Sequence, residues 1–140
     1  MKTRATTRLT LDGADSVVDA ARAHASALDV AVVIHVCDPA GDPLAMARMD
    51  GSPKFSIEIA RKKAWTAAAA EAATADLAAE FIGSPTLLHG VAGNVDELIT
   101  VGGGVPIRVG GAVVGAIGVS GATEQQDHEI ASTAATRGVE

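Results

Sequence analysis

The chain has 140 residues, of which 48% are hydrophobic, and its formal net charge is −6. This length and composition provide one hydrophobic core, so residues 1–140 are expected to form a single domain. The acidic balance and the absence of tyrosine exclude the basic, aromatic surface on which nucleic-acid binding depends.

No run of eighteen apolar residues that could cross a membrane is present. The first ten residues are partly basic but lack the apolar core of a secretory signal. The single cysteine, Cys37, allows no intramolecular disulfide, and no adjacent cationic residue activates its thiol. We therefore expect a cytoplasmic protein without membrane contact, in which Cys37 is a small buried hydrophobic residue.

The first part of the chain predicts a helix followed by a β-hairpin. Residues 11–28 carry apolar or small side chains at the three-four spacing of an amphipathic helix, with Thr10 as its N-cap. Residues 30–37 and 44–49 are extended segments separated by turn-forming proline, glycine and aspartate.

The longest predicted helix runs from Ser52, its expected N-cap, to about Ala73. Lys63 lies on its narrow face, at three-four spacing with small residues at positions 56, 60, 64 and 67. A lysine in this position either extends its amine to solvent or, within a cleft, binds an anionic ligand or acts as a base.

Beyond that helix, Thr74 is expected to cap a short helical segment that ends near Phe81. Residues 86–98 are expected to be irregular or to include one helical turn, and residues 98–101 to form a short strand.

The glycines of the next segment have two roles. Gly110 and Gly111 separate the apolar runs 105–109 and 112–119, as in a type I′ hairpin. The triplet Gly102–Gly104 is either a flexible turn or a nest of backbone amides for a carboxylate or phosphate.

A final helix is predicted from the capping box Thr123–Gln126, continuing through residues 127–135. Glu124 and Asp127 lie in its first turn, where the helix dipole favours acidic side chains without any catalytic role. The element order predicts an α+β fold with five antiparallel strands and helices outside the sheet.

Two histidines are candidate ligand-binding residues. His35 shares a strand face with Val33 and Cys37, so it is either buried under a helix or lines a cavity. His89 lies in the irregular segment, where it is either exposed and inert or at the edge of a pocket. No P-loop, H-E-x-x-H motif or cysteine pair is present, and no metal site is predicted.

Taken in order, the segments resemble the GlcG/HbpS-like family, also described as the haem-degrading or PduO C-terminal domain type. The matching segments are Leu9–Leu11, Asp38–Gly41, Met49–Gly51, Ser56, Ile59–Ala60, Lys63–Ala64, Thr66–Ala67, Gly103–Ile107, Gly115–Gly121, Gln126–Asp127 and Ile130–Ala131. The resemblance implies a profilin-like or PAS-like fold and a homo-oligomer, from dimer to octamer. It also implies a small-molecule ligand, because relatives include haem-binding proteins and domains attached to corrinoid adenosyltransferases.

The first hypothesis is therefore a small-molecule-binding protein whose leading ligand is haem or a related tetrapyrrole. A histidine, with His35 and His89 as candidates, would bind the iron, and cationic or backbone groups would contact the propionates. The scarcity of aromatic residues argues against a haem pocket, since such rings commonly supply much of its apolar contact.

The second hypothesis is a cofactor-free catabolic enzyme acting on a small carboxylate as an isomerase, lyase or hydrolase. Lys63 and the amides of Gly102–Gly104 would bind the anion, while Glu124, Asp127 or a histidine transfers protons. The third is an accessory subunit in which these residues only pack. The enzyme hypothesis requires that Lys63 and the glycine triplet open onto one cavity.

Overall fold

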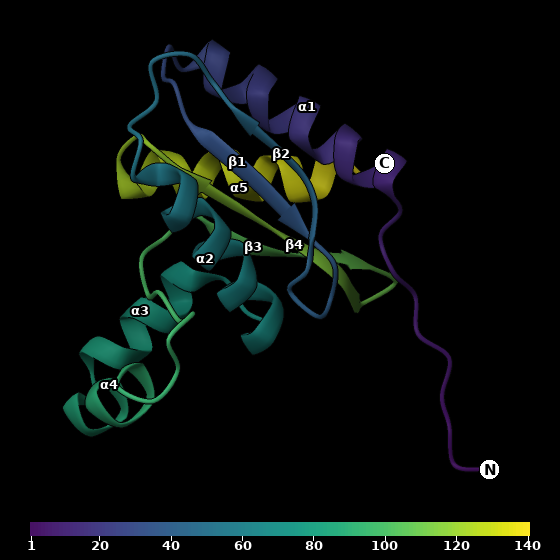
Figure 1. Cartoon of the computed structure of the whole chain (residues 1–140), viewed down its shortest axis with the longest axis vertical. Coiled ribbons are helices and arrows are strands. Elements are labelled where there is room, and N and C mark those ends of the chain that lie inside the picture. The colour runs from purple at the N-terminus through teal and green to yellow at the C-terminus, as the bar shows by residue number, and fades with distance from the viewer.

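The computed structural model describes residues 1–140 as an α+β fold built on a four-stranded antiparallel sheet of order β2-β1-β4-β3. The elements are α1 (Leu11–Ala27), β1 (Val33–Cys37), β2 (Pro43–Arg48), α2 (Ser56–Ala70), α3 (Thr74–Ile82), α4 (Pro85–Ala92), β3 (Gly104–Val109), β4 (Ala112–Ser120) and α5 (Glu124–Arg137). Helices α1 and α5 pack on one face of the sheet and α2 packs on the other, while α3 and α4 project to one side (Figure 1).

The predicted fold class is confirmed, but the prediction of five strands is wrong, since residues 98–101 form no strand. Their backbone is bonded to side chains of the neighbouring helices instead. The amide of Ile99 donates to Thr66 Oγ1 at 3.0 Å, and the carbonyl of Val101 accepts from Thr74 Oγ1 at 2.7 Å. A segment whose polar groups are satisfied in this way has no need of a strand partner.

Several local predictions are confirmed. The Thr10 side chain caps α1 by accepting from the amide of Gly13 at 3.1 Å. Gly110 and Gly111 both have positive φ, at 58° and 82°, as the type I′ turn between β3 and β4 requires. The capping box of α5 is complete, with both Thr123 and Gln126 side chains bonded to backbone.

The helices of the middle region differ from the predictions. Ser52 does not cap α2, because its hydroxyl donates to the carbonyl of Met49 at 2.8 Å and the helix begins at Ser56. Thr74 is the first residue of α3 rather than its cap. The segment predicted to be irregular contains α4, which Ser84 caps through the amide of Leu87 at 3.3 Å.

Small residues let α2 lie directly against the sheet. A Cβ atom on Gly118 of β4 would collide with the backbone of Ala60, so only glycine permits this approach. The alanines of α2 pack there with Ala116 and Cys37 in a small cluster. The main core lies on the opposite face, between the sheet and helices α1 and α5. No helix in this fold has both the length and the apolar character needed to span a bilayer.

Candidate functional site

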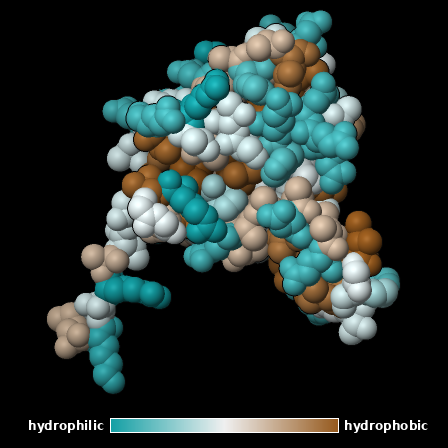
Figure 2. Space-filling view, turned by 180° about the vertical axis from the view of Figure 1, so that it is seen from behind, coloured by the Kyte–Doolittle hydropathy of each residue, from teal (hydrophilic) through white to brown (hydrophobic).

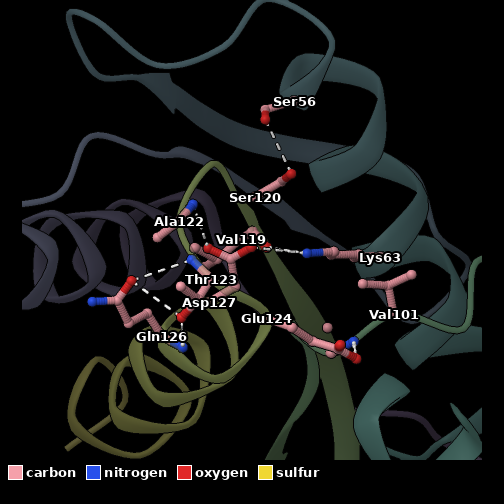
Figure 3. A network of polar contacts seen from close by, with 12 residues as sticks. Ser56, Lys63, Val101, Val119, Ser120, Ala122, Thr123, Glu124, Gln126 and Asp127 are labelled. Carbon is pink, nitrogen blue, oxygen red and sulfur yellow. Dashed lines mark hydrogen bonds and ion pairs between the residues drawn. The ribbon is translucent and has the colours of Figure 1, made fainter.

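A buried polar cluster lies where α2, the end of β4 and the start of α5 meet (Figure 3). Lys63 reaches this junction from the face of α2 predicted from its spacing, and that face is buried throughout. The Lys63 side chain is only 2% exposed, so the amine does not extend to solvent. Of the two interpretations made from the sequence, the structure favours an amine held within the fold.

Lys63 and Asp127 form an ion pair at the centre of the cluster. The Lys63 Nζ atom donates to Asp127 Oδ2 at 3.1 Å and to the carbonyl of Val119 at 2.9 Å. The other carboxylate oxygen of Asp127 accepts from the amide of Ala122 at 3.0 Å. Burial lowers the pKa of Lys63, whereas the charge of Asp127 opposes this shift.

The glycine triplet lies beside this ion pair, but two of its amides already have protein acceptors. The amide of Gly102 donates to Glu124 Oε1 at 2.9 Å, and that of Gly104 donates to Thr74 Oγ1 at 2.9 Å. The anion that faces Gly102 is therefore a carboxylate of the chain itself, supplied by the first turn of α5.

Gly103 provides the close contact between the triplet and Lys63. Its φ is +131°, and a Cβ atom at this position would lie 2.8 Å from Lys63 Nζ. Its carbonyl accepts from the amide of Val119 at 2.9 Å, which fixes the loop against β4. A glycine is needed here because a Cβ atom would also collide with the backbone carbonyl oxygen of Val119, the acceptor of Lys63 Nζ.

A pair of serine hydroxyls completes the cluster. Ser120 Oγ donates to Ser56 Oγ at 3.1 Å, and both residues are buried. Sequence reasoning missed this pair, because Ser56 was considered as a small residue of the helix face and Ser120 only as part of the matching segment Gly115–Gly121. The available signal was spacing, since Ser56 lies two helical turns before Lys63 and therefore on the same face.

These side chains border a cavity of about 280 Å³, called here the Lys63 cavity. Its polar lining includes Ser56, Lys63, Ser120, Glu124 and Asp127, and its apolar lining comes from Pro53, Phe55, Ile59, Ile99 and Val101. The glycines of the triplet do not line it, although Val101 before them does. The cavity thus brings together Lys63, Glu124 and Asp127. The triplet Gly102–Gly104 contacts Lys63 and Glu124 but does not line the cavity.

The two candidate histidines lie elsewhere. His35 is 6% exposed on β1, paired with Gly118 of β4 and Met46 of β2. Its Nε2 atom is buried without a hydrogen-bond partner. Burial and the positive charge of Arg61 lower the pKa of this imidazole. His89 is exposed in the last turn of α4 and lines neither the Lys63 cavity nor the surroundings of His35.

The family of this chain follows from a match that covers most of its length. A family model described as haem-degrading protein, HbpS-like, matches residues 9–136. The chain belongs to the HbpS-like family. The resemblance seen in its sequence is thereby confirmed.

Individual relatives of this HbpS-like chain match it over most of its length. An uncharacterized 15.0 kDa protein from the dhaT-dhaS intergenic region of Citrobacter freundii is 35% identical over 127 residues, which are 90% of this chain and 89% of the relative. The crystal structure of Klebsiella pneumoniae protein ORFY superposes with a TM-score of 0.91 at 31% identity, covering 99% of this chain and 95% of that one. A crystal structure of a PduOC:haem complex has a TM-score of 0.85 at 32% identity, covering 94% and 95% of the two chains.

Proposed function

We propose that this HbpS-like chain binds haem and that His35 is the residue that binds the iron. The observation that carries the proposal is the Nε2 atom of His35, which is buried and has no hydrogen-bond partner. Unpartnered buried polar atoms are rare in folded proteins, because each costs about 1–3 kcal/mol. The haem complex of a 32% identical relative supports the choice of ligand.

The protonation state of His35 suits this role. Burial and the charge of Arg61 lower its pKa, so the imidazole is neutral at neutral pH. A neutral imidazole has a lone pair free to bind iron, which the protonated ring lacks. His24 and His128 contact Glu129 and Ser132, respectively, each at 3.3 Å, although Nδ1 of His128 is also buried without a partner. Neither ring nitrogen of His35 has a side-chain partner, and of the two histidines for which this holds, His35 is buried and His89 is exposed.

The surface beside His35 supplies apolar contact for a porphyrin. Met46, its cross-strand neighbour, is 48% exposed, because α2 covers the middle of the sheet and leaves this edge strand open. Arg48 lies two residues further along the same strand face and forms no ion pair, so it is available to a propionate. Haem would reach Nε2 by displacing the side chains that now cover it.

Titration with haemin tests this proposal through the Soret band. We expect a saturable shifted band for the wild type and its loss in His35→Ala, with His35→Met giving a band of different position because thioether replaces imidazole. His89→Ala is the matched control and should bind as the wild type does. Circular dichroism of each variant checks that the fold is retained.

Three results would contradict the proposal: no band with the wild type, an unchanged band in folded His35→Ala, or loss of the band in His89→Ala or His128→Ala instead. With no ligand bound, the role of accessory subunit would gain support if a partner protein co-purifies.

We also propose that the chain forms a homo-oligomer. Ile82 at the end of α3 is 82% exposed, and apolar residues gather on the projecting α3–α4 lobe at the lower right of Figure 2. Contact between copies would remove this apolar surface from water. Light scattering after gel filtration measures the assembly, and Ile82→Glu should reduce its mass without unfolding the protein. A monomeric wild type would contradict this.

A further inference from the structure

The Lys63 cavity does not include His35, and its lining is polar at one end and apolar at the other. The buried side chains of Ser56, Lys63, Ser120 and Asp127 form the polar end together with the exposed side chain of Glu124. Phe55 and Val101, which are 73% and 40% exposed, stand at the open edge of the cavity. A volume of about 280 Å³ lies just below the range of about 300–1,000 Å³ typical of drug-sized ligands. The occupant must therefore be small, with one polar end and one apolar end.

The charges of the cavity favour an uncharged occupant. Three ionisable side chains line it, one lysine and two acids. The charge of Lys63 is matched by Asp127 at 3.1 Å, so the carboxylate of Glu124 remains as an unbalanced negative charge. Glu124 is an exposed residue at the mouth of the cavity, and its carboxylate would repel a ligand carboxylate that approaches within a few ångströms. This argues against the small carboxylate considered from the sequence.

Hydrogen-bond donors remain available at the polar end. The ammonium of Lys63 has three N–H groups, and the protein supplies two acceptors, Val119 and Asp127. The hydroxyls of Ser56 and Ser120 form one hydrogen bond with each other, which uses one of their two hydrogens and leaves the other without an acceptor. Each oxygen of Asp127 accepts one hydrogen bond, and Oε1 of Glu124 accepts from the amide of Gly102. The buried end of the cavity thus offers two donors, one from Lys63 and one from the serine pair.

We propose that the Lys63 cavity binds a small uncharged carbonyl compound, a short-chain ketone or aldehyde. Its oxygen accepts hydrogen bonds from Lys63 and Ser56, and its alkyl tail packs against Phe55, Ile59 and Val101. A carbonyl oxygen has two lone pairs and no hydrogen, which matches a site with two free donors. Glycine at position 103 keeps this arrangement, because a side chain there would collide with the carbonyl oxygen of Val119 and crowd the amine that it holds.

The test uses 2-butanone, which binds without the indiscriminate lysine chemistry of aldehydes, and propanoate as the carboxylate of similar size. We expect saturable amide shifts in nitrogen-proton NMR spectra with butanone, largest at the lining residues Ser56, Val101 and Ser120–Ala122. Propanoate should bind at least about tenfold more weakly. In Glu124→Gln, which removes the unbalanced charge and keeps the shape, propanoate should bind about tenfold more tightly than it does to the wild type.

Two further variants make the result decisive. Ser56→Ala removes one donor and should weaken butanone binding about fivefold or more. Lys62→Met changes a half-exposed residue of the same helix that does not line the cavity, so it is the control for a substitution outside the site and should bind as the wild type does. Folded His35→Ala should also bind butanone normally, which separates this site from haem binding.

The proposal is overturned if propanoate binds the wild type as tightly as butanone does, or if butanone shifts no amide of the cavity. It is also overturned if folded Ser56→Ala binds butanone with unchanged affinity.

Discussion

The amine of Lys63 and the carboxylate of Asp127 lie 3.1 Å apart in a part of the protein where their side chains are only 2% and 4% exposed. Removing two such ions from water costs several kcal/mol for each. The bonds to Val119 and Ala122 satisfy one further polar position on each partner and make the arrangement tolerable. The stability of the pair therefore depends on both partners being present.

Removing one partner should destabilise the protein far more than removing both. Lys63→Met or Asp127→Leu alone leaves an uncompensated buried charge, and we expect each to lower the free energy of unfolding by about 3–5 kcal/mol. The double variant restores charge balance and should recover most of that loss. Urea denaturation of the four proteins measures this as a double-mutant cycle. A double variant with a loss equal to the sum of the single losses would contradict the coupling.

Gly103 should tolerate no side chain. In Gly103→Ala the methyl group would collide with the backbone carbonyl oxygen of Val119 and lie 2.8 Å from Lys63 Nζ, at a φ of +131°. We therefore expect a loss of at least about 2 kcal/mol from strain and overpacking. Gly90→Ala in α4 is the matched control, because nothing lies within 4 Å of its added methyl group and alanine favours the helix. Thermal unfolding compares the two. Equal stabilities would show that the close contact at Gly103 is not what constrains this loop.

The elements that could be predicted from sequence are those whose signal is local. The cap at Thr10, the type I′ turn and the capping box of α5 each depend on residues within a few positions of one another. The strand predicted at residues 98–101 failed because Thr66 and Thr74, which bond that backbone, are about 30 residues away in sequence. A contact between residues this far apart leaves no pattern in the short sequence window from which a strand is predicted.

The same limit applies to the site. Helical spacing placed Lys63 on the buried face of α2, and the first-turn position of Asp127 was explained fully by capping. Their ion pair spans 64 positions and follows only from the packing of α5 against the end of β4. The amides of the glycine triplet were predicted to bind an external anion. The carboxylate that faces Gly102 belongs to Glu124. The sequence did not predict this contact, because it depends on where the first turn of α5 lies in space.

The buried imidazole of His35 should make stability depend on pH. Burial and Arg61 lower its pKa in the folded state, so below about pH 6.5 the unfolded chain binds a proton that the folded chain does not. The free energy of unfolding therefore falls as pH decreases from about 6.5 towards the lowered pKa, with a slope approaching about 1.4 kcal/mol per pH unit. Urea denaturation at several pH values measures this slope.

His35→Gln is the matched variant, because it keeps a polar side chain that does not titrate while all carboxylates titrate as before. Its stability should vary less steeply with pH over this interval. Identical slopes in the two proteins would show that His35 contributes nothing to the pH dependence.

Cys37 should be chemically inert in the folded protein. It is fully buried between β1 and α2, and burial raises the pKa of its thiol to about 12. At about pH 8 only about one molecule in ten thousand carries a thiolate, compared with about a quarter of unfolded chains. Reaction with a disulfide reagent such as DTNB should therefore be slower by about a thousandfold than in concentrated urea. Because the chain has a single cysteine, the absorbance of the released thiolate reports on this residue alone. A folded-state rate within tenfold of the unfolded rate would mean that the small-residue contact between α2 and the sheet opens frequently.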